Sequence, residues 1–91
     1  MSVIERIRNK IRNREYYLSS HAEEEMAEDD FERSDGENAI LNGFVQKKLT
    51  HDSRGTRYRL EGPANDGRII HLLCRFKEIG DLIIITVYEK E

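Results

Sequence analysis

Apolar residues near the start of the chain recur at the spacing of a helix. Arg and Glu side chains lie between them, which is typical of a short amphipathic helix. The pattern predicts a helix over residues 2–13 whose polar side is basic. The residues of the apolar stripe are Val3, Ile4, Ile7 and Ile11.

A second helix is indicated by Ser20, which Glu23 follows three positions later. This is the spacing of a capping box, in which the hydroxyl accepts from a first-turn amide and the carboxylate reaches back. We therefore expect a helix that starts at His21. Residues 16–18, between the two helices, are expected to form an extended link.

The same spacing recurs at Ser34 and Glu37, just before a short apolar segment. Gly43 is placed where glycine commonly ends a helix. The sequence therefore predicts a third, short helix before Gly43.

From Phe44 onward, alternation replaces the helical period. Four runs of strand composition are separated by short segments rich in Gly, Asp and Asn, which force neighbouring strands to be antiparallel. The runs are Phe44–His51, Arg57–Gly62, Arg68–Lys77 and Leu82–Glu89. We expect one α+β domain over residues 1–91. Two to three helices in 1–43 should pack on one face of a four-stranded antiparallel sheet in 44–89.

Alternation also assigns side chains to the two faces of the sheet. The core face is expected to carry Tyr58, Leu60, Ile70, Leu72, Cys74, Phe76, Ile83, Ile85 and Val87. The helix-free face is expected to carry Arg57, Arg59, His71, Arg75, Leu82, Ile84, Thr86 and Tyr88, with Lys47 or Lys48. The second set describes a basic face that also presents an imidazole and a phenol.

Charge is distributed unevenly along the chain. The net charge is −3, but residues 20–37 carry nine acids and one Arg, whereas residues 38–80 carry eight Lys and Arg against four acids. The half of the chain that should form the sheet is therefore basic. At 91 residues the chain is too short for a multidomain enzyme.

Cysteine content and hydropathy indicate the compartment. Cys74 is the only cysteine, so an internal disulfide and a multi-cysteine zinc site are excluded, and its place in an apolar run suggests a small buried side chain. The N-terminus lacks an apolar signal segment, and no apolar run approaches the length of a membrane span. We expect a soluble, cytoplasmic protein with no membrane partner.

The basic face has the groups that RNA cleavage needs. Attack by a 2′-hydroxyl requires a proton acceptor, a donor to the leaving oxygen and positive charge at the phosphorus. The candidate catalytic residues are His71, Tyr88, Arg57 and Arg75, and the candidate RNA-binding residues are Lys47, Lys48, Arg59 and Thr86. No metal or other cofactor is required. An ordinary solvated face with cross-strand ion pairs explains the same composition.

Two further features have more than one interpretation. His21 and Glu25 lie four apart on a predicted helix and could share a metal ion with His51 or His71, but two ligands on one helix are weak evidence, and a structural histidine near the helix start is the favoured interpretation. The acidic run over residues 23–37 is either a solvated helix surface or a docking surface for a basic partner.

The order of several segments resembles the small bacterial family called domain of unknown function 4258 (DUF4258), over residues 16–89. It also resembles a compressed version of the BrnT-type toxins, which are ribonucleases with a RelE-like fold. The segments are Ser20-His21-Ala22 with Met26, Ala39-Ile40-Leu41-Asn42-Gly43, Arg57-Tyr58, Asp66-Gly67-Arg68-Ile69-Ile70-His71 and Ile85-Thr86-Val87-Tyr88.

The resemblance implies a RelE-like or BrnT-like α+β fold and, for some family members, a toxin role beside an antitoxin protein. The positions that match the family motifs are His21, Arg57, Tyr58, His71 and Tyr88. His21 and Tyr58 thereby become possible site residues. BrnT-type toxins end their last strand with Ser-Ala-Arg, whereas this chain has Thr86-Val87-Tyr88, so the terminal arginine of that group is absent here.

The leading hypothesis is therefore a metal-independent mRNA endonuclease of a type II toxin–antitoxin pair, with mRNA and an antitoxin as partners. The alternative is a non-catalytic module of the same fold that binds protein or RNA through the same face or a sheet edge.

Overall fold

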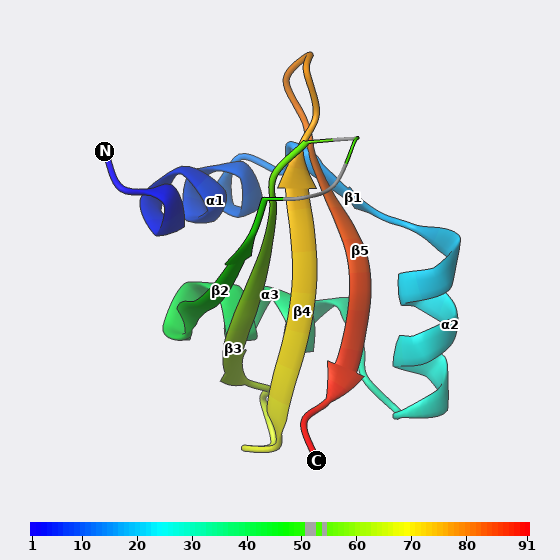
Figure 1. Cartoon of the computed structure of the whole chain (residues 1–91). Coiled ribbons are helices and arrows are strands. Elements are labelled where there is room, and N and C mark those ends of the chain that lie inside the picture. The colour runs from blue at the N-terminus through cyan, green and yellow to red at the C-terminus, as the bar shows by residue number, and fades with distance from the viewer. Residues whose placement is uncertain (51–52, 54) are drawn as a thin grey trace.

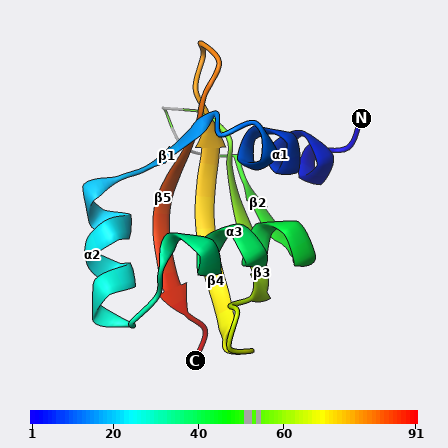
Figure 2. The ribbon, with the colours of Figure 1, turned by 180° about the vertical axis from the view of Figure 1, so that it is seen from behind.

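The computed structural model describes residues 1–50, 53 and 55–91. Over these residues three helices and five strands form an α+β fold, with the helices packed on one face of the sheet (Figures 1 and 2). In chain order the elements are α1 (Val3–Arg12), β1 (Tyr16–Leu18), α2 (Ser20–Glu28), α3 (Arg33–Asn42), β2 (Phe44–Leu49), β3 (Arg57–Pro63), β4 (Ile69–Phe76) and β5 (Leu82–Glu89). His51, Asp52 and Arg54 lie outside the described residues.

The sheet has the order β1-β5-β4-β3-β2. Strands β2 to β5 form the predicted antiparallel meander, but β1 pairs in parallel with β5 through Tyr16↔Leu82, Tyr17↔Ile83 and Leu18↔Ile84. The prediction of a purely antiparallel four-stranded sheet was therefore wrong, because the extended link expected at residues 16–18 is a fifth, parallel strand. A three-residue strand is too short to show alternation, and its partner lies far along the chain.

The first two helices begin close to the predicted positions. Ser2 caps α1 by accepting from the Glu5 amide, so the helix itself runs from Val3 to Arg12, within the predicted range 2–13. Helix α2 begins one residue earlier than predicted, because the Oγ of Ser19 rather than Ser20 accepts from the Ala22 amide at 3.0 Å.

Helix α3 also begins earlier than predicted, at Arg33. The Asp35 carboxylate accepts from the Glu32 amide at 2.8 Å and so fixes the first turn. The predicted box partner, Glu37, instead accepts a 2.6 Å hydrogen bond from the Tyr16 hydroxyl and links α3 to β1.

The end of α3 touches the backbone of β3. A Cβ at Gly43 would lie 2.2 Å from the Glu61 carbonyl oxygen, and a Cβ at Gly62 would lie 2.1 Å from the Ala39 carbonyl oxygen. Gly43 has an extended backbone, so this glycine is required for close approach rather than for a left-handed turn.

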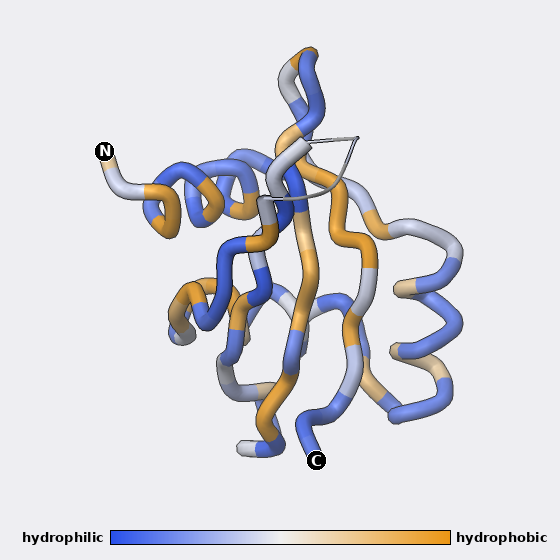
Figure 3. The backbone as a smooth tube through the Cα atoms, viewed as in Figure 1, coloured by the Kyte–Doolittle hydropathy of each residue, from blue (hydrophilic) through white to orange (hydrophobic). Residues whose placement is uncertain are grey.

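The core lies between the helices and the sheet. Ile7, Ile40, Leu60, Ile70, Leu72, Leu82, Ile84 and Val87 are almost fully buried. Figure 3 shows that apolar residues follow β4 and β5 whereas α2 is mainly hydrophilic. The predicted inward residues of β3 and the first three of β4 are buried, and Phe76 packs against them while half-buried.

The assignment of faces in β5 was wrong in its first half. Leu82 and Ile84 are buried, whereas the predicted core residues Ile83 and Ile85 are half-buried. A β-bulge explains the change, because Leu73 pairs with Thr86 while Cys74 pairs with Ile84, which leaves Ile85 as an extra residue. An extra residue reverses the facing of all that follows.

Side chains of α2 and its two cap residues bind the backbone of β5 after Ile84, where β1 no longer pairs with it. Glu25 Oε1 accepts from the Val87 amide at 3.1 Å, and Asp29 Oδ2 accepts from the Glu89 amide at 3.0 Å. The Ser19 hydroxyl donates to the carbonyl of the bulged Ile85 at 2.7 Å. Two members of the acidic run thus complete the hydrogen bonding of the sheet.

Candidate functional site

Three cross-strand rows cross the face of the sheet that the helices of the described chain leave open (Figure 1). The first row is Phe44, Glu61, His71 and Tyr88, and the second row is Lys47, Arg59, Leu73 and Thr86. The third row contains Leu49 with Arg57 and Arg75 with Ile83. These rows place most of the predicted site residues on one face.

The first row forms a connected polar group. His71 Nε2 lies 2.9 Å from Glu61 Oε1, and both side chains are largely buried, with 14% and 18% exposed. Lys90 Nζ lies 3.1 Å from the same carboxylate oxygen. The Tyr88 ring stands edge-on to the imidazole, with ring centroids 5.8 Å apart.

The charge on Glu61 fixes the role of the imidazole. The hydrogen bond from His71, and then that from Lys90, hold the pKa of Glu61 below its ordinary value. A carboxylate can only accept, so His71 Nε2 carries a proton and donates it to Glu61. This contact occupies Nε2, and Nδ1 is the ring nitrogen outside the pair.

Two bulges shape this face. The bulge at Ile85 turns Thr86 and Tyr88 to the open face, beside Leu73 and His71. In β2, Val45 pairs with Leu60 while Lys47 pairs with Arg59, so the extra residue is Gln46. Bulges commonly re-aim side chains beside functional sites.

The second row supplies positive charge next to the first. Arg59 Nε donates to the Gln46 side chain at 2.7 Å, which orders its guanidinium. Lys47 lies in the same row. Lys48, in contrast, pairs with Tyr58 in the register and so faces the helix side.

Tyr58 does not reach the open face. It is 9% exposed, belongs to the core and meets the Phe76 ring edge-on with centroids 6.3 Å apart. The structure therefore places this possible site residue in a packing role.

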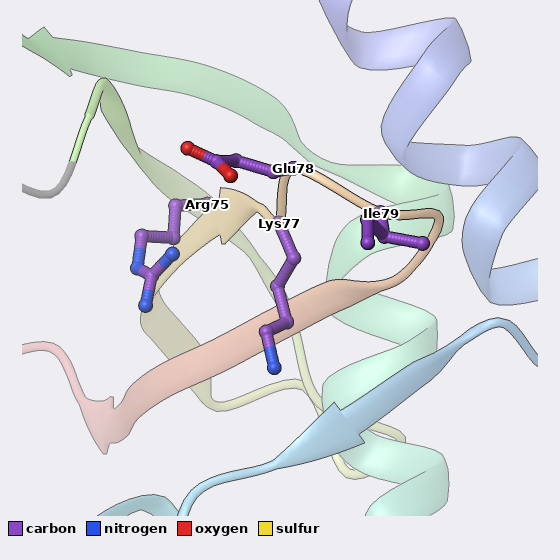
Figure 4. Close-up of a pocket in the computed structure, with 4 residues that line it drawn as sticks. All are labelled: Arg75, Lys77, Glu78 and Ile79. Atoms are coloured by element: carbon purple, nitrogen blue, oxygen red, sulfur yellow. The ribbon is translucent and has the colours of Figure 1, made fainter.

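The arginines of the third row lie at a distance from the histidine. Arg75 is four residues beyond His71 on β4, which is about 13 Å along a strand. It lines a shallow pocket of about 370 Å³ with Lys77, Glu78 and Ile79 at the β4–β5 turn (Figure 4). Arg57 lies one row beyond Arg59 on β3. The two arginines therefore do not converge on His71 and Tyr88, whereas Arg59 is closer.

Sequence reasoning missed Glu61 and Lys90. The turn at residues 63–67 carries the signal for Glu61, because a hairpin closed there sets Pro63 against Ile69 and hence Glu61 against His71. Lys90 follows the last strand, and only the folded chain brings it to Glu61.

His21 and Cys74 take no part in this group. His21 is 64% exposed and lies 3.4 Å from Glu25, whose carboxylate also accepts from the Val87 amide. The described part of the chain contains no cluster of three His, Cys, Asp or Glu side chains that could hold a metal ion. His51, a third ligand in one hypothesis, is outside that part. Burial raises the pKa of the Cys74 thiol to about 12, so the thiol is not a nucleophile.

Arg68 has a structural place at the β3–β4 turn. Its guanidinium donates to the Asp66 carboxylate at 2.8 Å and to the Asp29 carbonyl at 2.7 Å, and lies 4.2 Å from the Phe31 ring centroid. Arg68 therefore fastens the turn to the loop between α2 and α3.

The described helices include none long and apolar enough to cross a membrane. No curated protein and no solved structure matches the chain. One family model does match it, over residues 18–89. This range holds the complete first row, whereas Lys90, which contacts Glu61, lies just outside it. The chain therefore belongs to the family described as a domain of unknown function, DUF4258.

Proposed function

We propose that the open face of the sheet binds single-stranded RNA and cleaves it as an endonuclease. The observation that carries the proposal is the row Glu61–His71–Tyr88, in which an oriented imidazole lies against a phenol on a face with several cations. An open sheet face suits unpaired strands, whose bases can stack on an aromatic ring.

The reaction is transfer of the phosphorus from the 5′-oxygen to the 2′-oxygen. His71 Nδ1 takes the proton of the 2′-hydroxyl, the 2′-oxygen bonds to phosphorus, and the bond from phosphorus to the 5′-oxygen breaks. Tyr88 gives its proton to the leaving 5′-oxygen. The products are a 2′,3′-cyclic phosphate and a 5′-hydroxyl, and no oxidant or water is consumed.

The cations have two roles in this proposal. Arg59 lies on the row next to the first, and its role in this proposal is to stabilise the extra negative charge on the phosphorane. Lys47 in the same row as Arg59, and Arg57 and Arg75 in the third row, hold the flanking phosphates.

The biological setting follows from the resemblance to BrnT-type and RelE-like toxins. We propose that the protein is the toxin of a type II pair, that it acts on mRNA in the cytoplasm and that an antitoxin protein inhibits it. The absence of the terminal arginine of BrnT-type toxins is offset here by Arg59, which reaches the face from another strand.

Cleavage of a labelled single-stranded RNA by the purified protein tests the proposal. Tyr88→Phe and His71→Ala should each lower the rate by about 100-fold or more, since general acid–base groups contribute that much. Arg12→Ala is the matched control, because Arg12 lies on α1, one of the helices on the other face of the sheet (Figure 1). Products without a cyclic phosphate, or full activity in both variants, would show that the assignment is wrong. Urea unfolding shows that each variant is folded.

Glu61→Gln tests the positioning of His71. The amide keeps the size of the side chain but removes the charge that favours the proton on Nε2. We expect a lower kcat with little change in KM, because the amide no longer holds the imidazole in its orientation as the carboxylate does. An unchanged kcat contradicts the role.

One observation favours a non-catalytic binding module instead. Phe44 in the first row is 54% exposed, and Ile69 at the start of β4 is 38% exposed. Exposed apolar side chains next to polar ones are typical of protein contact surfaces. If the ligand is RNA, its affinity should fall steeply as the salt concentration rises. If the ligand is a protein held by these apolar residues, Phe44→Asp should abolish binding.

A further inference from the structure

A second basic surface lies where α1 meets the turn between β4 and β5. A pocket of about 390 Å³ there is lined by Arg6 and Lys10 of α1, by Glu15, and by Phe76 and Lys77 at the end of β4. Three cations against one carboxylate make this pocket a site for anions.

Aromatic rings lie beside two of the cations that line this pocket, although only one of the rings, Phe76, is itself part of the lining. The Arg6 guanidinium lies 4.4 Å from the Phe76 ring centroid, and Lys77 Nζ lies 5.1 Å from the Tyr17 ring centroid. Lys10 approaches Glu15 only to 3.9 Å. Cations held over rings keep their hydrogen-bond donors available to an anion.

The pocket continues into the open face through Lys77. Lys77 also lines the pocket at the β4–β5 turn, together with Arg75 of the third row. Figure 4 shows the Arg75 and Lys77 side chains extending in the same direction from the end of β4. A chain of cations thus runs from the third row, past Lys77, to Arg6 and Lys10.

We propose that this chain of cations binds the phosphates of an RNA strand where it leaves the open face and passes over the end of β4 to α1. This inference rests on the proposed RNA binding and adds the path and the footprint of the strand. The repeated placement of single cations favours a polyphosphate backbone, and an acidic peptide is the competing ligand.

The test compares two single-stranded RNAs, of about 6 and about 16 nucleotides, by fluorescence anisotropy at several salt concentrations. Arg6→Glu and Lys10→Glu should each weaken binding of the longer RNA roughly tenfold and lower its salt dependence by about one ion. Binding of the shorter RNA should not change. Arg12→Glu is the matched control, because it makes the same charge change on α1 outside the pocket lining.

Each outcome decides one question. If the wild-type protein binds neither RNA, the proposed function fails and the path fails with it. If it binds both and the α1 variants bind the longer RNA normally, only the path fails. Equal losses for both RNAs, or for Arg12→Glu, would show a general effect of charge and overturn the path. Competition by polyglutamate as effective as that by RNA would assign the surface to an acidic protein.

Discussion

Replacing Gly62 by Ala is expected to be severely destabilising, although it adds a single methyl group. The new Cβ would lie 2.1 Å from the Ala39 carbonyl oxygen and 2.9 Å from its Cα. Heavy atoms in ordinary contact are about 3.5 Å apart, so the two backbones would have to separate by about 1.4 Å. Both contacts are to backbone atoms, and no side-chain rotation relieves them.

The magnitude follows from the packing of α3. Overpacking of a well-filled core costs about 1–3 kcal/mol, and a clash of helix backbone with strand backbone belongs at the upper end, at about 3 kcal/mol or more. A domain of this length has a total stability of about 5–13 kcal/mol. The melting temperature should therefore fall by about 12 °C or more.

Gly36→Ala is the matched control. It also replaces glycine by alanine, but on α3, and it is expected to raise the free energy of unfolding rather than lower it. Its Cβ would meet only the Leu72 Cδ1, at 3.9 Å, and alanine in a helix is favoured over glycine by about 0.5–1 kcal/mol. Urea unfolding followed by circular dichroism measures both free energies. Equal effects of the two substitutions, or a cost below about 1 kcal/mol for Gly62→Ala, would refute the contact between α3 and β3.

Three further results are expected. Cys74 should not react with a thiol reagent at pH 8 in the native protein and should react on unfolding in urea, since burial raises its pKa to about 12; fast native reaction would contradict its burial. Tyr16 should make the free energy of unfolding fall at high pH. Burial and then the Glu37 hydrogen bond raise the pKa of Tyr16 from 10.0 to about 12. Its contribution to the free energy of unfolding is therefore complete below pH 10.0 and is lost as the pH rises through about 12. Tyr16→Phe should lack that loss in urea unfolding between these pH values. Glu25→Ala should cost about 1–3 kcal/mol, because the buried Val87 amide loses its acceptor, whereas Glu25→Gln, which retains an oxygen, should cost less than 1 kcal/mol by the same measurement; equal costs would show that the hydrogen bond is unimportant.

Local patterns predicted most of the fold. The helix over residues 2–13 and the four strands of the meander lie within a few residues of their expected bounds, because alternation and capping act over a few neighbouring residues. The placement of Arg57, Arg59, His71 and Tyr88 on one face was predicted from the same alternation.

Contacts between distant segments could not be predicted in this way. Strand β1 exists because Tyr16 and Leu18 pair with Leu82 and Ile84 of β5. The sequence of a three-residue segment does not indicate which distant strand it pairs with. The N-cap of α2 moved to Ser19 because that hydroxyl also serves the carbonyl of Ile85, whose bulge is itself a long-range feature.

The candidate site depends on these irregular features more than on the regular ones. Had β5 continued the register of Leu82 and Ile84 without the bulge, Tyr88 would face the helices and His71 would have no aromatic neighbour on that strand. Had β2 lacked its extra residue, Lys47 would lie on the helix side rather than beside Arg59. A regular meander would therefore turn Lys47, Thr86 and Tyr88 to the helix side, and the two bulges place them on the face where regular alternation already places His71 and Arg59.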